Sequence, residues 1–356
     1  MRRLFISLSV LSLLIACKRD PQIMTTVYDV DYVNHSDTFI YGNLIDREFI
    51  GADNMVLFDT LLMVMSNNTD GQLNVYGINS MTHLGTFCQK GRAKNEYISA
   101  NLICNQAYYK DGHVILVVAD FPNKLKEVDV TASIQNGKTV VLDDKICMSM
   151  EDGEFVILDD DYANRYEFVK YIPIDRQKSK FQIKYYLYKN NKRKELSFFR
   201  SLMDSEYKNT ILPYLGKLYK HPYKNIVVQS FERMDYLLYM DFDSLKYYSI
   251  HQSGSPTFGD TFIKNNDPRT ALYFMDGASS PDYLMFMYRH GNYSLKECGE
   301  EPISELLVFD WDGHFIASFK LDRNLFAIEY DGLHKVLYGM DIYEKIYTYD
   351  LSLRLP

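Results

Sequence analysis

The most constraining feature of the sequence is a series of short apolar runs near its C-terminal end, over residues 305–351. Each run is about five to seven residues long, which suits a strand better than a helix. Each break between runs carries Asp or Gly, the residues that favour tight turns. At residues 310–313 we expect a hairpin turn in which Gly313 adopts a positive φ. The stretch therefore predicts antiparallel strands joined by short turns.

The strand pattern returns at intervals of about 40 residues, a spacing typical of β-propeller blades. For example, Val-Phe-Asp at 308–310 is followed by the similar Thr-Tyr-Asp at 348–350. The abundance of Tyr (30) and Phe (21) also fits half-buried strands better than helices. We therefore predict an all-β fold, a six-bladed β-propeller. Its six units cover residues 55–91, about 98–145, 148–202, 213–251, 270–320 and 325–351.

The last unit contains only three recognisable strands, one fewer than a complete blade needs. Residues 27–33 alternate in polarity as a strand does, and they belong to no hairpin of their own. An incomplete blade would leave a strand edge open to aggregation. We therefore predict that the ring is closed by an N-terminal strand, with residues 27–33 pairing with residues 345–351 and completing the last blade.

The N-terminal end has the features of a bacterial export signal. Arg2 and Arg3 precede an apolar run over residues 4–15, and the segment ends in Leu-Ile-Ala-Cys at Cys17, like a lipobox. A membrane span would need about 20 apolar residues, more than this run supplies. An ordinary signal peptide with a chance cysteine is the other alternative. The predicted organisation is a lipoprotein signal peptide over 1–16, a tether over 17–23 and a single β-propeller domain over 24–356.

Acylation of Cys17, for example with palmitate, would then hold the protein to a membrane of the cell envelope. We expect the outer membrane, with the periplasmic or surface face left open, and a monomer. Removal of residues 1–16 takes away two arginines and no acidic residue, which changes the net charge from −8 to −10. This negative charge argues against a nucleic-acid partner and against attraction to an anionic membrane surface.

Three stretches resemble a family of bacterial lipoproteins with a six-bladed, TolB-like propeller. The first is Gly-Arg-Ala-Lys-Asn-Glu-Tyr at 91–97, which is similar to the family's Gly-Arg-Gly-Pro-x-Glu-Phe loop but lacks its central Gly-Pro. The others are the aromatic strand at 282–288 and the stretch from 307–313 through Asp350. The resemblance implies the fold and the lipid anchor, and it brings no activity. Arg92 and Glu96 are the candidate binding residues, with a structural ion pair as the alternative interpretation.

The sequence predicts no catalytic residue, metal site or cofactor. No two of the eight His lie close enough in sequence to form a ligand pair, and no nucleotide-binding loop occurs. Residues 159–161 are three consecutive Asp, but the glycine and the following ligand of a calcium loop are missing. Whether the four remaining cysteines form disulfides stays open. They are Cys88, Cys104, Cys147 and Cys298.

Two classes of function are compatible with these observations. The first is a non-enzymatic envelope lipoprotein that binds a protein partner or a glycan through its loops. Exposed tyrosines could stack on sugars, although most are expected to pack between blades. The second is a propeller enzyme, a hydrolase or lyase, with a site at the central channel. It predicts several His, Asp or Glu side chains converging on the ring axis.

Overall fold

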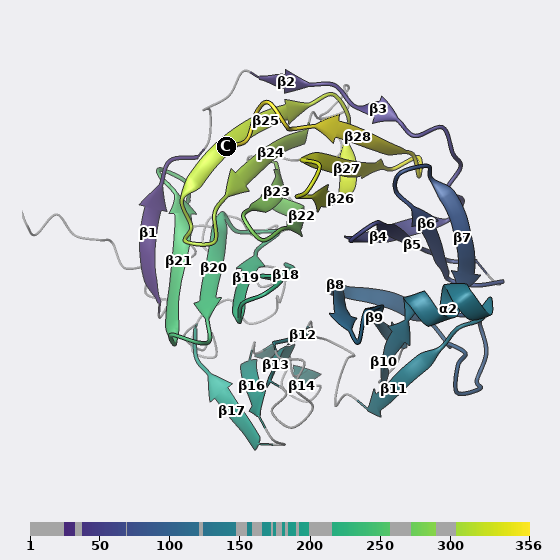
Figure 1. Cartoon of the computed structure of the whole chain (residues 1–356). Coiled ribbons are helices and arrows are strands. Elements are labelled where there is room, and N and C mark those ends of the chain that lie inside the picture. Colours follow the sequence, from purple (N-terminus) through teal and green to yellow (C-terminus); the bar gives the residue numbers. More distant parts are fainter. Residues whose placement is uncertain are drawn as a thin grey trace, which may run out of the picture.

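The computed structural model shows the chain as sheets arranged side by side in a ring around a common centre (Figure 1). The strands nearest the centre are β4, β8, β12, β18, β22 and β26, and each sheet extends outward from its inner strand. This is the predicted all-β propeller fold. The structure describes residues 25–32, 38–68, 70–120, 124–146, 155–158, 166–171, 174–175, 180–181, 184–189, 192–198, 216–256, 272–289 and 304–356.

Apart from β1 and β2, which pair in parallel with β21 and β25, the described strands form antiparallel sheets that follow one another along the chain. The first sheet contains β4 (Ala52–Phe58), β5 (Leu61–Ser66), β6 (Leu73–Gly77) and β7 (Thr82–Phe87). The second contains β8 (Ala100–Lys110), β9 (His113–Asp120), β10 (Lys124–Asp129) and β11 (Val141–Ile146), with helix α2 (Val130–Asn136) between its last two strands. The third contains β12 (Phe155–Ile157), β13 (Tyr166–Tyr171), β16 (Lys184–Lys189) and β17 (Lys192–Leu196), and β14 (Ile174–Asp175) pairs separately with β15 (Lys180–Phe181).

The remaining sheets follow the same plan and also take in strands from the N-terminal segment. One contains β18 (Leu218–Lys220), β19 (Ile226–Ser230), β20 (Tyr236–Asp241) and β21 (Lys246–Gln252), with β1 (Thr26–Val30) outside β21. The next contains β22 (Phe274–Ser279), β23 (Leu284–Tyr288), β24 (Ser304–Phe309) and β25 (Phe315–Leu321), with β2 (Phe39–Ile40) outside β25. The last contains β26 (Leu325–Asp331), β27 (Val336–Asp341), β28 (Ile346–Asp350) and β3 (Asn43–Leu44).

The side chains are described unevenly among these sheets, and this bears on the predicted number of blades. Five sheets, those starting with β4, β8, β18, β22 and β26, are described through most of their side chains. The sheet of β12, β13, β16 and β17 is described in its backbone and at a few side chains. Five blades are therefore described together with most of their side-chain packing. The predicted sixth blade would have to be the sheet of β12, β13, β16 and β17.

The prediction that residues 27–33 pair with residues 345–351 and close the ring is wrong. Residues 26–30 form β1, which pairs in parallel with β21, far in sequence from residues 345–351. The last sheet is instead completed by β3, where Leu44 pairs with Tyr347 and Asn43 pairs with Thr348. An N-terminal strand does close the sheet, but it has only two residues. The alternation at 27–33 identified a strand correctly and could not identify its partner.

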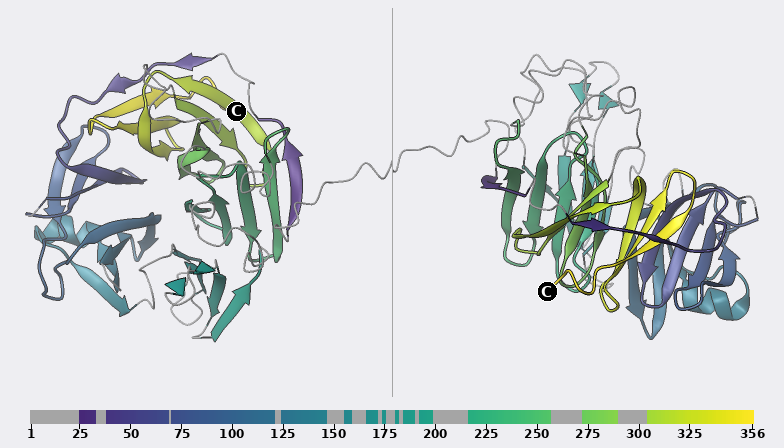
Figure 2. Two further views of the ribbon diagram at one scale, coloured as in Figure 1. Left: turned by 180° about the vertical axis from the view of Figure 1, so that it is seen from behind. Right: turned by 90° about the horizontal axis from the view of Figure 1, so that it is seen from above.

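The described residues 25–32 and 38–44, which contain β1, β2 and β3, are here called the N-terminal strap. It runs along the outer rim of three successive sheets and covers the outer edges of β21, β25 and β28 (Figures 1 and 2). Covering an edge satisfies its free N–H and C=O groups and prevents pairing with another chain. The strap therefore links neighbouring sheets from outside as well as closing the ring.

Aspartates at strand ends explain why the breaks in the sequence pattern carry this residue. Asp241, Asp331 and Asp341 end β20, β26 and β27, and Asp310 follows β24. One carboxylate oxygen of each accepts two backbone N–H groups of the following turn, at 2.8–3.1 Å. Such a side-chain acceptor stabilises a tight turn. Gly313 adopts φ 79°, as the hairpin prediction required.

Aromatic side chains fill much of the space between neighbouring sheets. One cluster joins Tyr32, Tyr239, Phe286 and Phe309 with residues of the β18–β21 and β22–β25 sheets. The ring of Tyr239 stacks on that of Tyr248 at 5.0 Å, and edge-to-face contacts dominate elsewhere in the cluster. These arrangements are the favourable ones for aromatic pairs. In this cluster, Tyr and Phe side chains therefore pack within a sheet and between neighbouring sheets.

Candidate functional site

The loop that carries the predicted binding residues Arg92 and Glu96 joins β7 to β8. Its two ends are held together by backbone hydrogen bonds, from Gly91 N–H to Tyr97 O at 2.9 Å and from Tyr97 N–H to Gln89 O at 2.9 Å. The Arg92 side chain is exposed. The Glu96 carboxylate accepts the Ala93 N–H at 2.9 Å and so closes the loop on itself.

Gly91 is needed for this loop because the Glu96 carboxylate occupies the place of a side chain. A Cβ added at Gly91 would lie 1.9 Å from Glu96 Oε2. The matched motif is therefore a packing requirement: a glycine makes room for the glutamate that caps the loop. A binding role for Arg92 and Glu96 stays a prediction.

A buried ion pair that the sequence analysis missed anchors the same loop. Lys126 Nζ lies 2.9 Å from Asp120 Oδ2, and both side chains are almost fully buried. The same Nζ donates to the Glu96 carbonyl at 2.5 Å and lies 4.1 Å from the centre of the Tyr97 ring. Asp120 Oδ1 accepts the Ile98 N–H at 2.7 Å. Each charge therefore has a partner and further hydrogen bonds, as buried charges require.

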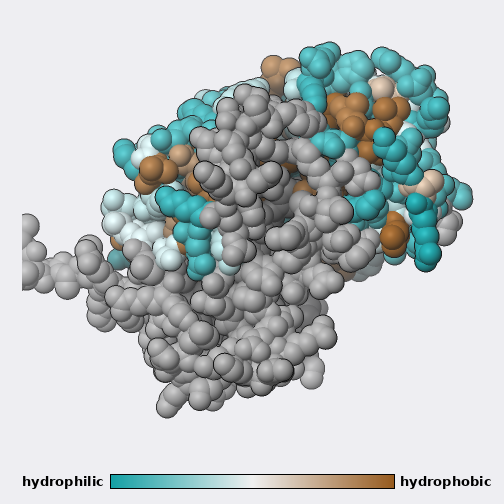
Figure 3. Space-filling model, turned by 90° about the horizontal axis from the view of Figure 1, so that it is seen from below, coloured by the Kyte–Doolittle hydropathy of each residue, from teal (hydrophilic) through white to brown (hydrophobic). Residues whose placement is uncertain are grey.

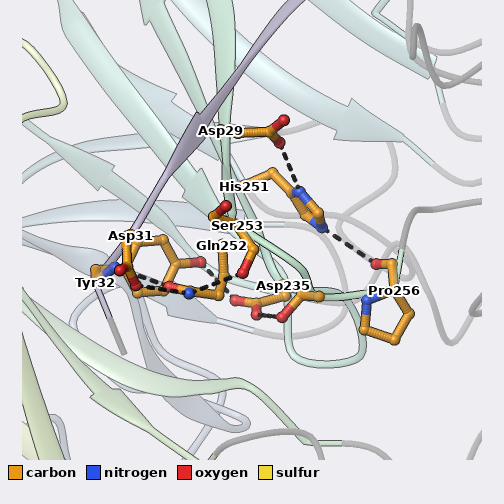
Figure 4. Close-up of polar contacts among 9 residues, drawn as sticks. Asp29, Asp31, Tyr32, Asp235, His251, Gln252, Ser253 and Pro256 are labelled. Atoms are coloured by element: carbon orange, nitrogen blue, oxygen red, sulfur yellow. Dashed lines mark hydrogen bonds and ion pairs between the residues drawn. The ribbon is translucent and has the colours of Figure 1, made fainter. Parts of the chain in front are cut away.

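The structure also contains a buried polar cluster where the N-terminal strap meets the β18–β21 sheet (Figure 4). Its centre is the Asp235 carboxylate, which lies just before β20. It accepts hydrogen bonds from the hydroxyls of Tyr32 at 2.5 Å, Ser255 at 2.6 Å and Tyr288 at 2.7 Å. The three donors come from the strap, from the segment after β21 and from β23. A single carboxylate thus joins three parts of the chain that are distant in sequence.

Two residues at the end of β21 add further contacts to the strap (Figure 4). Gln252 accepts the Tyr32 N–H at 2.8 Å and donates to Asp31 at 3.1 Å. His251 Nδ1 lies 3.1 Å from Asp29 Oδ1, and its Nε2 lies 3.3 Å from the Pro256 carbonyl oxygen. The strap is therefore held by side chains as well as by the β1–β21 ladder.

Burial sets the acid–base behaviour of this cluster. Burial raises the pKa of Asp235, and the hydrogen bonds from Ser255, Tyr32 and Tyr288 oppose that rise. Burial, together with the nearby Asp235 carboxylate, holds the pKa of Tyr32 and that of Tyr288 well above the ordinary value. Asp235 is 1% exposed, Tyr32 0% and Tyr288 2%, so no substrate can reach them in this conformation. In this conformation the cluster fastens the strap to the β18–β21 sheet.

Three of the inner strands, β4, β22 and β26, share a second feature, a bulge near the start of the strand. The pairing register shifts between Ala52 and Asn54, between Phe274 and Asp276, and between Leu325 and Ala327. A bulge turns the extra residue out of the ladder and is common next to binding sites. Burial raises the pKa of Asp53, the extra residue in β4.

An ion pair joins the residue just before β18 to the inner strand β22. Lys217 Nζ lies 2.6 Å from Asp276 Oδ1, and Asp276 Oδ2 accepts the Ile328 N–H at 2.9 Å. Across the described part of the chain, no group of three or more His, Cys, Asp or Glu is placed to hold a metal ion.

Several predictions concern residues that the structure leaves outside its description. Cys17, the signal peptide at 1–16 and the tether at 17–23 all lie there, as do Cys147, Cys298 and the Asp run at 159–161. The side chain of Cys104 is likewise not described. Cys88 has a free, buried thiol, and burial raises its pKa to about 12. No helix among the described residues is both long and apolar enough to cross a membrane.

Comparison with known proteins supports the fold. No family model matches the chain, and no curated protein matches its sequence. A solved structure of a duf4221 family member from Bacteroides vulgatus matches with a TM-score of 0.55 and 11% identity, over 88% of this chain and 96% of that one. A candidate exported protein of Bacteroides fragilis matches with a TM-score of 0.50 and 9% identity, over 91% and 98%. At these identities, the likeness shows a shared fold alone.

Proposed function

We propose that this protein is an exported envelope lipoprotein, anchored through Cys17, whose propeller is a non-enzymatic binding module for a protein or a glycan. In this proposal the sheet of β12, β13, β16 and β17 is the sixth blade of a TolB-like ring. The acyl chains sit in the outer membrane, and the domain is a monomer. The lipobox-like ending at Cys17 and the resemblance of residues 91–97 support the lipoprotein assignment.

The observation that carries the proposal is the way the chain enters the ring. The strap begins at Thr25, eight positions after Cys17, and lies on the outer rim of the propeller. Eight residues span at most about 28 Å when extended, so an anchor at Cys17 would keep the rim near the membrane. The turns at both ends of the ring would stay available to a partner. In propellers these loops vary freely and bind ligands.

Lipid labelling of whole cells tests the anchor. Cells expressing the full chain would be grown with radioactive palmitate, and the immunoprecipitated protein would be compared with a Cys17→Ser variant. We expect label on the wild type and on a Cys298→Ser control, and none on Cys17→Ser. Equal labelling of Cys17→Ser, or an unlabelled wild type, would show that the anchor is assigned wrongly.

Crosslinking of intact cells followed by affinity purification tests the binding role, together with a glycan array probed with the same protein. A specific protein partner or a specific glycan would support it. The absence of both would count against a binding module.

A further inference from the structure

The β18–β21 sheet carries two exposed apolar side chains at one of its ends. Because successive strands are antiparallel, the β18–β19 turn and the β20–β21 turn lie at the same end of this sheet. Asn225 joins the two turns: its carbonyl accepts the Phe242 N–H at 3.0 Å, and its amide donates to Asp243 at 2.9 Å. Tyr223 in the first turn is 82% exposed, and Leu245 in the second is 59% exposed.

The last sheet has the same feature, in its β26–β27 turn and in the segment after β28. These two pieces of chain meet where the Lys335 carbonyl accepts the Leu351 N–H at 2.8 Å. Leu333 in the turn is 86% exposed, and Leu353 in the segment is 93% exposed. Apolar groups form separate patches on an otherwise hydrophilic described surface (Figure 3), and leucines this exposed need an explanation.

Contacts through the β22–β25 sheet show that both pairs of side chains belong to one end of the ring. The ring of His221, beside Tyr223, packs on Trp311, with the ring centres 4.8 Å apart. Trp311 Nε1 donates to the Ser280 carbonyl at 2.8 Å, and a Cβ added at Gly332 would lie 3.3 Å from Ser280 Cβ. The turns of three neighbouring sheets are therefore in contact, and Tyr223, Leu245, Leu333 and Leu353 are the apolar tips of this end.

The N-terminal strap enters the ring at the same end. Thr26 pairs with Tyr248, and Thr25 Oγ1 lies 2.9 Å from Ser249 Oγ. The strap therefore starts beside the first residues of β21, directly after the turn that carries Leu245. From there β1 runs parallel to β21, away from this end of the ring.

The entry point decides which end of the ring an N-terminal anchor would bring to a membrane. The opposite end also has exposed apolar side chains, Ile342 and Tyr343 in the β27–β28 turn, so exposure alone does not choose. The eight residues from Cys17 to Thr25 reach at most about 28 Å. To bring the opposite end to the lipid, they would first have to run back along β1, which is about 17 Å long. The end that carries the apolar tips lies directly at the entry point.

The charges at this end suit a lipid surface without net charge. Three of the four tips are followed directly in sequence by an exposed basic residue, Lys224, Lys246 or Arg354. A basic side chain beside an apolar tip reaches the lipid phosphates while the tip enters the hydrocarbon boundary. Exposed acids at the same end, such as Asp243 and Asp312, offset these positive charges. Insertion of apolar groups, and not attraction to anionic lipid, is therefore the driving force to expect.

We propose that this end of the ring lies on a zwitterionic phospholipid surface, with the four apolar tips inserted between the headgroups. The proposal rests on the anchor at Cys17 proposed above and adds an orientation to it. The anchor alone leaves both ends of the ring available to a partner. With the tips in the lipid, the opposite end faces away from the membrane and is the one presented for binding.

Quenching of tryptophan fluorescence by lipid tests the orientation. The full chain, purified in detergent, would be reconstituted into vesicles of phosphatidylcholine and phosphatidylethanolamine whose acyl chains carry bromine, a contact quencher. Leu333→Trp and Leu353→Trp place a reporter on two tips that pack against little, so neither should disturb the fold. Ile342→Trp is the matched control, because Ile342 is 57% exposed in a turn at the opposite end. The native Trp311 is 7% exposed, and its emission is measured in the wild type and subtracted.

We expect the added tryptophans at positions 333 and 353 to lose emission in the brominated vesicles and to shift to shorter wavelength in unbrominated ones. The tryptophan at position 342 should show neither change. Absence of quenching at either tip, or equal quenching at position 342, would overturn the inference. A shift at the tips that already occurs in detergent and grows with protein concentration would mean that a second copy covers this end, and would also overturn it.

Flotation of the same vesicles with wild type and Cys17→Ser separates the inference from the anchor. Wild type that floats while its tip reporters stay unquenched would overturn the inference and leave the anchor standing. Cys17→Ser that floats as well as wild type, with quenched tip reporters, would support the inference and overturn the anchor. Wild type that does not float would overturn both.

Discussion

Replacement of His221 should change how the stability of the fold depends on pH. The side chain is buried at the start of the loop after β18, and its Nδ1 accepts the backbone N–H groups of Tyr223 and Lys224. Protonation would convert this acceptor into a donor facing two donors. Burial, with the nearby positive charges of Lys224 and Lys220, lowers the pKa of His221 to about 4 from 6.5. The native loop therefore requires a neutral ring.

The sign and size of the effect follow from linkage. As the pH falls below 6.5, the unfolded chain takes up a proton at His221, and the folded chain does not until about pH 4. The contribution of His221 to the free energy of unfolding is fully present above pH 6.5 and is lost as the pH falls from 6.5 to about 4. A shift of this size corresponds to at most about 3.4 kcal/mol. Because the loop borders solvent, screening reduces this, and we expect about 1–2 kcal/mol.

Urea denaturation of the full chain between pH 4 and pH 7 would measure the effect. The chain has a single tryptophan, Trp311, and it packs on His221, so its fluorescence reports on this region. We expect the difference in unfolding free energy between wild type and His221→Asn to shrink as the pH falls. His314→Asn is the control with the opposite sign, because the hydrogen bond that the His314 ring donates to the Asp310 carboxylate raises the pKa of this exposed histidine. Its stabilising contribution is present at low pH and is lost as the pH rises. A difference for His221→Asn that is constant across this range would refute the reasoning.

Two further predictions concern the strap. Tyr32→Phe removes the hydroxyl that donates to Asp235 at 2.5 Å, and we expect a loss of about 1.5–3 kcal/mol in urea denaturation together with faster hydrogen exchange in β1; unchanged exchange would show that the hydroxyl does not fasten the strap. Gly42→Ala places a Cβ 2.7 Å from the Tyr349 ring and should lower the free energy of unfolding by about 1–3 kcal/mol, because it displaces β3. Gly77→Ala is the control and should change stability little, because its Cβ would lie 3.9 Å from its nearest neighbour. Equal effects of the two substitutions would contradict this account of ring closure.

Local patterns in the sequence were sufficient for the strands and their turns. Alternating polarity marks a strand because one face is buried, and each strand-ending Asp supplies the acceptor for its own turn. Both signals depend on residues a few positions apart. The β20–β21 and β24–β25 hairpins, with Asp241 and Asp310 in their turns, are therefore readable from sequence.

Long-range pairing and the polar sites were not readable in this way. The strand at 26–30 pairs with residues 248–252, and nothing in its alternation distinguishes β21 from β28 as a partner. The two-residue strand β3 is too short to show any pattern. Asp235 meets Tyr32 and Tyr288 only after the sheets have assembled, so no motif joins them. The loop at 91–97 did stand out as a motif, and the structure adds that its glycine and glutamate pack against each other.

The geometry of the strap determines how the propeller would bear a pull from a membrane anchor. β1 pairs in parallel with β21 over five residues, and the polar contacts of Tyr32 and Gln252 lie at the far end of β1 from Thr25. A force applied at Thr25 along the strand would load all the β1–β21 hydrogen bonds together, in shear, because none can open before its neighbours move. The polar cluster lies behind them and would resist last. A strap attached by one end alone would peel away one hydrogen bond at a time. Under the proposed anchor at Cys17, a pull on the strap would therefore load its ladder in shear and not by peeling.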